Sequence, residues 1–309
     1  MTSFKWQGRE DEPHGLLTQR WHQTIANTQV DGAANILLGF PCDLGVINNG
    51  GRAGAKMGPD AIRRALCNLA WHAPTTIADA GDSACHDDLV AAQQLFADKL
   101  SEHLRAHQFV IGLGGGHEIA WASYQGLMKT GVENLGIINI DAHFDLRQPA
   151  PLTSSGTPFY QIAQDCKKRD ARFQYTCLGV ADAANTALLF DYAKRSGTRY
   201  LNDVNCSFDN MCDTVTPMLD TCESLYLSIC LDAFSASAAP GVSAPSALGV
   251  EIHTVVRFIH WLSVQAKQRK ISWLIADIAE MNPKFDVDER TAKLAARLIF
   301  EIIHAQYRV

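Results

Sequence analysis

Three polar residues follow a mostly apolar run in the segment IINIDAHFDLR, where Asp141, His143 and Asp145 alternate with apolar residues. On an extended backbone the side chains at i, i+2 and i+4 lie on one side, so these three are expected to face the same way. Two carboxylates held together in this way repel each other and lose hydration unless a cation neutralises them. Oxygen ligands with an imidazole suit Mn²⁺, with Zn²⁺, Fe²⁺ or Co²⁺ as substitutes. The pattern therefore predicts a metal site, and the alternative is a polar strand end exposed to solvent.

Two more apolar runs end in residues of the same kind. In VIGLGGGHEIA a glycine-rich turn leads to His117, and this turn lacks both the Lys-Ser/Thr of a P-loop and the spacing of a dinucleotide-binding turn. In LYLSICLDAF the same alternation predicts that Ser228, Cys230 and Asp232 share one face. Taken alone, His117 is a structural histidine and Cys230 a core thiol. Their positions at predicted strand ends favour convergence with the metal site instead.

A fourth run, LIADIAEMNP, ends in Asp277, and Glu280 follows three residues later. Glu280 could hold a cationic group of a substrate near the metals, whereas Asp277 fits a helix N-cap or turn residue equally well. The chain has no G-x-S-x-G nucleophile elbow and no C-G-S-C-W setting for a cysteine nucleophile. Water activated by a metal is therefore the chemistry that these residues favour.

Short apolar runs alternate with longer segments of helical periodicity, which is typical of a parallel sheet covered by helices on both faces. The predicted strands are 35–41, 108–115, 135–141, 174–180, 198–202, 225–232 and 271–277. The predicted helices are 58–69, 87–107, 117–130, 184–195, 251–267 and 289–305. No Pro/Ser-rich linker divides the chain, so we expect a single α/β domain over residues 1–309 with an N-terminal arm at about 1–34.

The composition argues against several classes of partner. With 27 Lys and Arg against 33 Asp and Glu, and no basic run, the chain has no electrostatic footprint for nucleic acid or an anionic membrane. No window approaches the roughly 18 apolar residues of a membrane span, and the first residues lack the apolar stretch of a signal peptide. The nine cysteines include no CxxC pair and have no disulfide-scaffold spacing. We therefore expect a cytoplasmic protein that acts on a small molecule.

The four strand ends together resemble the ureohydrolase superfamily of arginase and agmatinase. The matching segments are GRAGAKMGPDAIRRAL, GLGGGHEIAWASY, NIDAHFDLR, SSGTPF, PGVSAP and DIAEMNPKFDVDERTAKLAARLI. They extend over nearly the whole chain, from about residue 35 to the C-terminus. The GGGHE, FDLR and SSGTPF variants are most similar to the formimidoylglutamase branch of that superfamily, which acts in histidine degradation.

The resemblance implies a three-layer α/β/α sandwich around a mostly parallel eight-stranded sheet, a homo-oligomer, and two Mn²⁺ per subunit at the carboxyl ends of the strands. It assigns one ion to His117, Asp141, Asp145 and a bridging residue, and the other to Asp141, His143, Asp232 and the same bridge. The bridge falls on Cys230, where the family pattern S-x-D-x-D has an aspartate. A thiolate is softer than a carboxylate, favours Zn²⁺ over Mn²⁺ and has no second oxygen to span two ions. We therefore expect the second Mn²⁺ to bind weakly or not at all.

The implied reaction is hydrolysis of N-formimidoyl-L-glutamate, an amino-acid-derived substrate, to L-glutamate and formamide. The metals lower the pKa of a water that attacks the amidine carbon, and the expected catalytic residues are Asp141, His143 and Glu280. The substrate also carries two carboxylates, which need cationic, amide or hydroxyl donors. The residues expected to bind it are Asn48, Arg52, Arg147, Ser155, Thr157 and Glu280. For the two arginines the alternative is a surface salt bridge.

The resemblance also leaves the source of one proton open. Arginases have a histidine in the loop equivalent to SSGTPF, whereas this chain has Ser155 there. The proton for the leaving amine is therefore expected to come through water or another acid such as Glu280.

Two other functions stay open at this point. One is another hydrolase on the same scaffold, directed at a guanidino substrate as in arginase, agmatinase or guanidinobutyrase, or at an amide with a single zinc, as in the deacetylases that share this fold. The other is a metal-poor relative that binds an amino acid without turning it over. Release of formamide from formimidoylglutamate, set against urea from arginine or agmatine, separates the hydrolases from one another.

Overall fold

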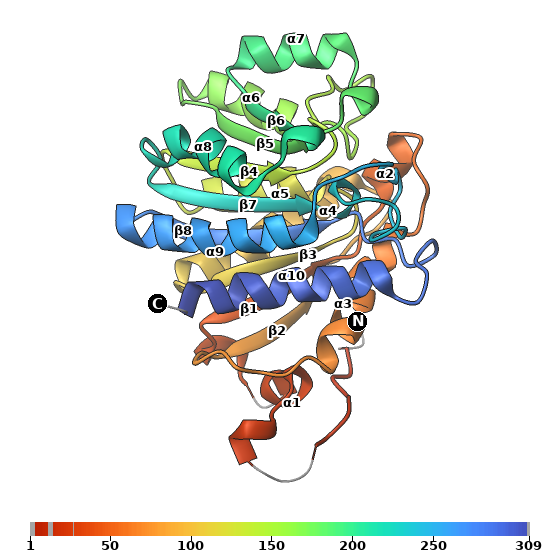
Figure 1. Ribbon diagram of the computed structural model, residues 1–309, viewed down its shortest axis with the longest axis vertical. Coiled ribbons are helices and arrows are strands. Elements are labelled where there is room, and N and C mark those ends of the chain that lie inside the picture. Colours follow the sequence, from red (N-terminus) through yellow and green to blue (C-terminus); the bar gives the residue numbers. More distant parts are fainter. Residues whose placement is uncertain (1–3, 12–14, 27, 308–309) are drawn as a thin grey trace.

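A parallel β-sheet forms the middle of the structure, a computed structural model that describes residues 4–11, 15–26 and 28–307. Eight strands of these described residues pair in the order β2-β1-β3-β8-β7-β4-β5-β6, and every pairing is parallel. The strands are β1 Asn35–Phe40, β2 Ile77–Asp82, β3 Phe109–Gly114, β4 Leu135–Ile140, β5 Gln174–Val180, β6 Arg199–Asn202, β7 Ser224–Cys230 and β8 Ser272–Ala279. Figure 1 shows helices in front of the sheet and behind it. The predicted three-layer α/β/α sandwich is confirmed.

The inner strands are apolar because helices cover both of their faces. Every residue of β1, β3, β4 and β5 is buried. A strand of this kind has no solvent-facing side, so its sequence is a continuous apolar run rather than an alternation. This is why the short apolar runs predicted the inner strands to within one or two residues.

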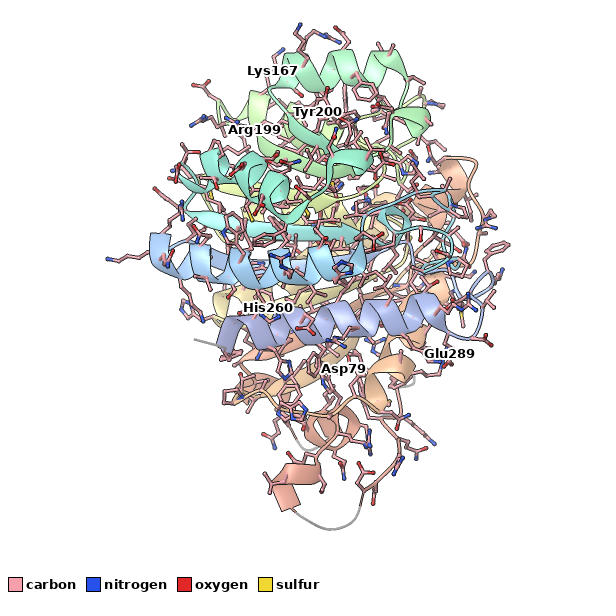
Figure 2. The ribbon with its side chains drawn as sticks, in the orientation of Figure 1. Asp79, Lys167, Arg199, Tyr200, His260 and Glu289 are labelled. Carbon is pink, nitrogen blue, oxygen red and sulfur yellow. The ribbon has the colours of Figure 1, made fainter. Side chains whose placement is uncertain are left out.

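The edge strand β2 is absent from the predicted strands because its sequence, IADAGD, is only half apolar. Its two aspartates serve as ion-pair partners for Arg63, a buried residue of α3 (Gly58–Cys67) that is 1% exposed. The guanidinium lies 2.9 Å from the carboxylate of Asp79, which is labelled in Figure 2, and 2.6 Å from that of Asp82. Hydrophobic periodicity does not report such pairs, so it gives no signal for this strand.

The helices form two layers, each with its own apolar core. One layer contains α1 Trp21–Ala26, α3, α8 Phe208–Leu219, α9 Ile252–Arg269 and α10 Arg290–Tyr307. The other contains α4 Leu89–Arg105, α5 Ile119–Met128, α6 Pro158–Lys168 and α7 Ala187–Ser196. The short α2, Leu44–Asn48, follows β1 at the end of the sheet where the loops gather. Among the helices that the structure describes, none has the length and apolarity needed to cross a membrane.

Four helices lie outside the predicted elements. They are α1, α2, α6 and α8, whose sequences are short, polar or interrupted, as by Pro217 inside α8. Helix α1 belongs to the predicted N-terminal arm, yet its Trp21 is fully buried in the apolar core. The predicted helix 117–130 is also shorter than expected, because α5 begins only at Ile119. His117 is therefore a loop residue.

Gly115 joins three strand ends at the place where that loop begins. Its backbone N–H donates to the carbonyl of Phe40 at 3.0 Å, and its own carbonyl accepts the N–H of Glu280 at 2.8 Å. A Cβ added at Gly115 would lie 1.9 Å from the carbonyl oxygen of Cys42 and 2.7 Å from that of Phe40. Only a glycine lets the loop before His117 pass this close to β1.

We predict that Gly115→Ala lowers the free energy of unfolding by about 1–3 kcal/mol, the usual cost of forcing an extra carbon into a packed site. The measurement is urea-induced unfolding of the wild type and the variant. Gly32→Ala is the matched control, because an added Cβ there meets no atom within 4 Å. Equal unfolding midpoints for Gly115→Ala and the control would contradict the close approach.

Candidate metal centre

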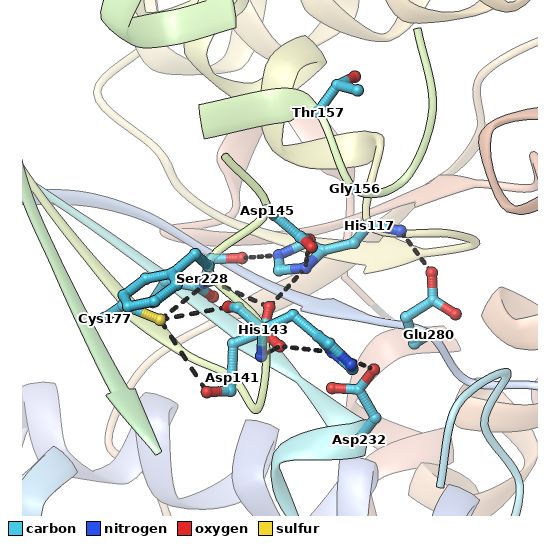
Figure 3. Close-up of polar contacts among 12 residues, drawn as sticks. His117, Asp141, His143, Asp145, Gly156, Thr157, Cys177, Ser228, Asp232 and Glu280 are labelled. Carbon is cyan, nitrogen blue, oxygen red and sulfur yellow. Dashed lines mark hydrogen bonds and ion pairs between the residues drawn. The ribbon is translucent and has the colours of Figure 1, made fainter. Parts of the chain in front are cut away.

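The predicted site residues lie at the carboxyl ends of four adjacent strands, β3, β8, β7 and β4. They are His117 after β3, Asp141 directly after β4, Cys230 at the end of β7 and Glu280 directly after β8. Parallel strands present their carboxyl ends at one edge of the sheet, so side chains from separate parts of the sequence converge there. Figure 3 shows this convergence for His117, Asp141 and Glu280.

Asp141 is the centre of the group, because each of its carboxylate oxygens faces a different histidine. Oδ2 lies 2.9 Å from Nδ1 of His117, and Oδ1 lies 3.5 Å from Nδ1 of His143. The backbone N–H of His143 donates to Oδ1 at 2.7 Å, and the amide of Asn139 donates to Oδ2 at 3.0 Å. Asp141 is fully buried. Its carboxylate is thus held in the orientation that two separate cations would need from a shared ligand (Figure 3).

Two further carboxylates flank the histidines on the outside. Oδ2 of Asp145 lies 2.8 Å from Nδ1 of His117, and Oδ2 of Asp232 lies 3.3 Å from Nδ1 of His143. The predicted residues therefore meet, but not by strand alternation. Strand β4 ends at Ile140, Asp145 has a left-handed backbone with φ of 49°, and Asp232 lies in the 3₁₀ turn Leu231–Ala233 after β7. Loop geometry rather than the pleat brings these side chains together.

The charges of this cluster are balanced only if the histidines are protonated. Burial lowers the pKa of both rings, but the facing carboxylates outweigh it and raise the pKa of His143 to about 12 and that of His117 well above its usual range. Burial and the charge of Asp141 raise the pKa of Asp145 to about 6. For Asp141 itself burial favours the neutral acid, but the hydrogen bonds from His117 and His143 prevail and lower its pKa. Protons thus supply the positive charge that cations would otherwise bring.

The donor atoms form two groups that share Asp141. Within each group the ligand atoms lie within 4.8 Å of one another: one group is His117, Asp141 and Cys230, and the other is Asp141, His143 and Asp232. Among the described residues, Oδ1 of Asp232 and Oε2 of Glu280 are buried without a hydrogen-bond partner. Orphaned buried oxygens are costly unless a ligand satisfies them. Oxygen and imidazole donors of this kind fit divalent cations, Mn²⁺ included.

A buried chain of hydrogen bonds fixes the ring of His117 from behind. Nε2 of His117 lies 2.9 Å from Oγ of Ser228, whose hydroxyl donates to Oδ1 of Asp277 at 2.6 Å. Because that hydroxyl has only one hydrogen, it must accept the Nε2–H of His117, which leaves Nδ1 to face the metal donors. Tyr226 and Ser123 donate to the other oxygen of Asp277 at 2.6 and 2.8 Å. Asp277 therefore lies inside β8 and holds Ser228, and the helix N-cap alternative is wrong.

Glu280 lies beside the metal donors and borders a cavity. Its Oε1 accepts the backbone N–H of His117 at 2.8 Å, and its backbone is left-handed with φ of 68°. Burial, and then the charge of Asp232, raise its pKa well above the usual range. The cavity has a volume of about 320 Å³. Its lining includes His117, His143, Asp145, Cys230, Asp232 and Glu280 from the metal donors and their neighbour, and Asn49, Arg52, Arg147, Ser155 and Ser243 from the surrounding loops.

The residues predicted to bind substrate divide into two sets. Arg52, Ser155 and Glu280 line this cavity, Asn48 and Thr157 line a neighbouring one of about 490 Å³, and Arg147 lines both. Asn48 donates to the carbonyl of Thr153 at 2.9 Å, and the hydroxyl of Thr157 donates to the carbonyl of Ser154 at 2.9 Å. Asn48 and Thr157 are therefore absent from the lining of the cavity beside the metal donors, and the side chains of both are engaged with backbone carbonyls.

The two arginines at the cavity differ in the number of partners that their guanidinium groups have. Arg52 lies over the ring of Phe285, 3.8 Å from its centroid, and donates to the carbonyls of Ser243 and Val242. Arg147 is exposed, and its guanidinium makes no hydrogen bond or ion pair with the residues that the structure describes. Arg147 is thus the freer cation at the mouth of the site.

Several residues that support the site were not predicted from the sequence. Ser123 and Tyr226 are ordinary core positions of a helix and a strand, and only their contact with Asp277 distinguishes them. Asn139 could have been found, because an amide inside the apolar run LGIINI needs a buried partner. Its side-chain amide donates to Asp141 and, at 3.1 Å, to the hydroxyl of Tyr175.

The sequence is similar to one protein family over most of its length. Residues 33–305 match the model of the arginase family. The formimidoylglutamase of Aromatoleum aromaticum is 46% identical over 315 residues, which cover 96% of this chain and 91% of that protein. The formimidoylglutamase of Vibrio cholerae is 45% identical, with coverage of 98% and 95%. That of Ralstonia nicotianae is 43% identical, with coverage of 96% and 94%.

Solved structures share the same fold. Trypanosoma cruzi formiminoglutamase with Mn²⁺ matches with a TM-score of 0.82 at 22% identity, over 93% of this chain and 98% of that one. Bacillus subtilis arginase matches with a TM-score of 0.73 at 24% identity, over 87% and 98%. At such identities the likeness establishes the arrangement of the sheet and helices alone.

We predict that Ser228→Ala weakens cation binding by roughly 10- to 100-fold, the usual effect of losing a group that orients a metal ligand. The physical reason is that His117 loses the acceptor that fixes its ring. The measurement is equilibrium dialysis of the folded variant against Mn²⁺. Ser263→Ala is the control, since Ser263 is also buried and donates to a carbonyl, that of Ala305 at 2.7 Å, away from the site. Unchanged affinity in Ser228→Ala would show that the ring is held without it.

We also predict that cation binding near pH 7 releases at least two protons per chain, one from each histidine, because a ring nitrogen must lose its proton to donate to a metal. The raised pKa values of His117 and His143 mean that both rings are protonated in the cation-free chain. Affinity should therefore fall as the pH is lowered. Calorimetry of Mn²⁺ binding in buffers with different heats of ionisation counts the protons, and a count of zero would contradict this charge state.

Proposed function

The chain belongs to the arginase family, and we propose that it hydrolyses N-formimidoyl-L-glutamate to L-glutamate and formamide, as part of histidine degradation. The proposal is supported by relatives with the name formimidoylglutamase that match nearly the full length of the chain at 43–46% identity. The observation that carries the chemistry is the carboxylate of Asp141, which faces two histidines with its two oxygens. This is the arrangement that hydrolysis by a pair of cations requires.

The donors on this chain would hold two divalent cations, for which we propose Mn²⁺. His117, Asp141 and Cys230 would hold one of them, with the Asp145 carboxylate beside His117, and Asp141, His143 and Asp232 would hold the other. Bound cations would supply a nucleophilic hydroxide near neutral pH by lowering the pKa of water. Asp141 and His143 would be catalytic because they would hold the cations that supply this hydroxide next to the substrate. Burial of Asp141 keeps bulk water from competing for its oxygens.

Glu280 would receive the amidine end of the substrate. Its Oε1 is held by the N–H of His117, while its buried Oε2 has no partner among the described residues and is free for a nitrogen of the amidinium. A charge-assisted hydrogen bond of this kind is stronger than one between neutral groups. The same contact would orient the amidine carbon toward the cation positions, because Glu280 and both histidines line one cavity.

The opposite end of the substrate carries two carboxylates. Arg147, with its unengaged guanidinium at the cavity, is the residue that we propose to bind one of them, since the planar fork of arginine matches a carboxylate. Ser155, in the same lining, would donate from its hydroxyl. Arg52 is partly committed to the carbonyls of Ser243 and Val242, so its contribution would be smaller.

The reaction also requires a proton for the departing amine. Attack of water on the amidine carbon and cleavage of its bond to the glutamate nitrogen leave that nitrogen as an amine, which must gain a proton. We assign this transfer to Oε2 of Glu280 as a relay: it would take the proton that the attacking water releases and pass it to the glutamate nitrogen. Burial and the charge of Asp232 raise the pKa of Glu280 well above its usual range, which favours such uptake. The SSGTPF loop contains no histidine that could transfer this proton.

The test compares three substrates with Mn²⁺-loaded protein: N-formimidoyl-L-glutamate, L-arginine and agmatine. We expect formamide and glutamate from the first, and no urea from the others. Asp141→Ala should lower kcat/KM by roughly a thousandfold or more, because cation stabilisation of the transition state is worth several kcal/mol. Asp220→Ala is the control, since Asp220 pairs with Arg269 at the surface, where such a pair contributes little. Preferred release of urea, or full turnover by Asp141→Ala, would overturn the proposal.

A further inference from the structure

Cys230 is the one thiol of the described residues that belongs to a group of metal donors. It is the last residue of β7 and is 1% exposed, so it faces the interior of the site rather than solvent. The nearby Cys177 differs, because its thiol donates to the carbonyl of His143 at 3.3 Å and is thereby accounted for. The position of Cys230 raises the question of which cation its sulfur would bind.

The sulfur is not placed equally between the two groups of donors. Its Sγ lies within 4.8 Å of the ligand atoms of both His117 and Asp141, whereas the group around His143 consists of Asp141, His143 and Asp232. Asp145 adds an oxygen to the side of His117, 2.8 Å from Nδ1. The thiol of Cys230 would have to lose its proton for the sulfur to bind a cation. One group thus offers nitrogen, two oxygens and sulfur, and the other nitrogen and two oxygens.

These two donor sets have different chemistry. Thiolate ligands select softer cations such as Zn²⁺ or Co²⁺, whereas carboxylates suit Mn²⁺. Four donors that include one sulfur and one imidazole are also the number and kind of ligands that zinc takes. Nitrogen and oxygen alone give no comparable discrimination. The position of one atom, Sγ of Cys230, therefore makes the two halves of the centre unequal.

We infer that Cys230 makes the centre asymmetric: the position beside His117 takes a soft divalent cation such as Zn²⁺ or Co²⁺ in preference to Mn²⁺, and the position beside His143 is the one that Mn²⁺ fills. This inference rests on the proposed function in that both assume a two-cation site at Asp141. It differs from a pure manganese centre in the identity of the first cation. It also gives a reason for a cysteine among carboxylates, since the sulfur directs a particular metal to a particular position.

The first experiment uses the wild-type chain, freed of cations with a chelator and titrated with Co²⁺. A thiolate bound to Co²⁺ absorbs in the near ultraviolet by charge transfer, whereas oxygen and nitrogen ligands do not give this band. We expect the band to grow up to one equivalent of Co²⁺ and then to stop. A large excess of Mn²⁺ should leave it in place and should add one Mn²⁺ per chain by elemental analysis. A band that is absent, or that grows to two equivalents, would overturn the inference.

The second experiment replaces the sulfur. In Cys230→Asp the band should be lost, and the Mn²⁺ concentration needed to displace the first Co²⁺ should fall at least as much as in outer-shell variants, roughly 10- to 100-fold. Cys212→Ser is the matched control, because Cys212 is also buried but lies on α8 outside both donor groups. Equal displacement curves for Cys230→Asp and the wild type would contradict the inference.

These results are separable from the proposed function. The cobalt spectrum and the metal content are measured without substrate, so they stand or fall independently of turnover. If the chain binds the two cations as expected but releases no formamide from formimidoylglutamate, the proposed function fails and the asymmetric centre remains. If formamide is released but the protein shows no thiolate band, the asymmetric centre fails alone.

Discussion

The sharing of one buried carboxylate between two histidines is the interaction on which the rest of this site depends. Asp141 has no solvent exposure, and its oxygens point to His117 on one side and His143 on the other. A charge in this position is tolerable only with positive partners close by. In the cation-free chain the protonated histidines provide them. Every other acidic residue of the cluster, Asp145 and Asp232 included, increases the need for further positive charge, which two cations would supply.

The fold is arranged so that this cluster can form. Four parallel strands end around it, and the close passage of Gly115 against β1 sets the start of the loop that carries His117. From behind, Ser228 and Asp277 hold the ring of His117 through a fully buried hydrogen-bond chain. The charged centre is therefore supported by backbone and by buried side chains rather than by surface groups. Such support is what a site with defined cation positions needs.

Some elements of the structure could be predicted from the sequence and others could not. The inner strands were predictable because complete burial leaves an apolar run. The edge strand β2 was not predictable, because its Asp79 and Asp82 form ion pairs with Arg63 and interrupt the apolar pattern. The metal donors were predictable by residue type at strand ends. Their actual geometry was not, because the left-handed backbone of Asp145 is set by loop contacts. Thr157 illustrates the same limit: it lines the neighbouring cavity, whereas Ser155, only two residues earlier, lines the cavity beside the metal donors.

The central claim is that Asp141 bridges two cation positions, and anomalous X-ray diffraction from crystals grown with one equivalent of Co²⁺ and an excess of Mn²⁺ tests it most directly. Anomalous peaks locate each cation without reference to activity. The account predicts two peaks on either side of the Asp141 carboxylate, one next to Nδ1 of His117 and the other next to Nδ1 of His143. A single peak, or two peaks of which only one contacts Asp141, would contradict it.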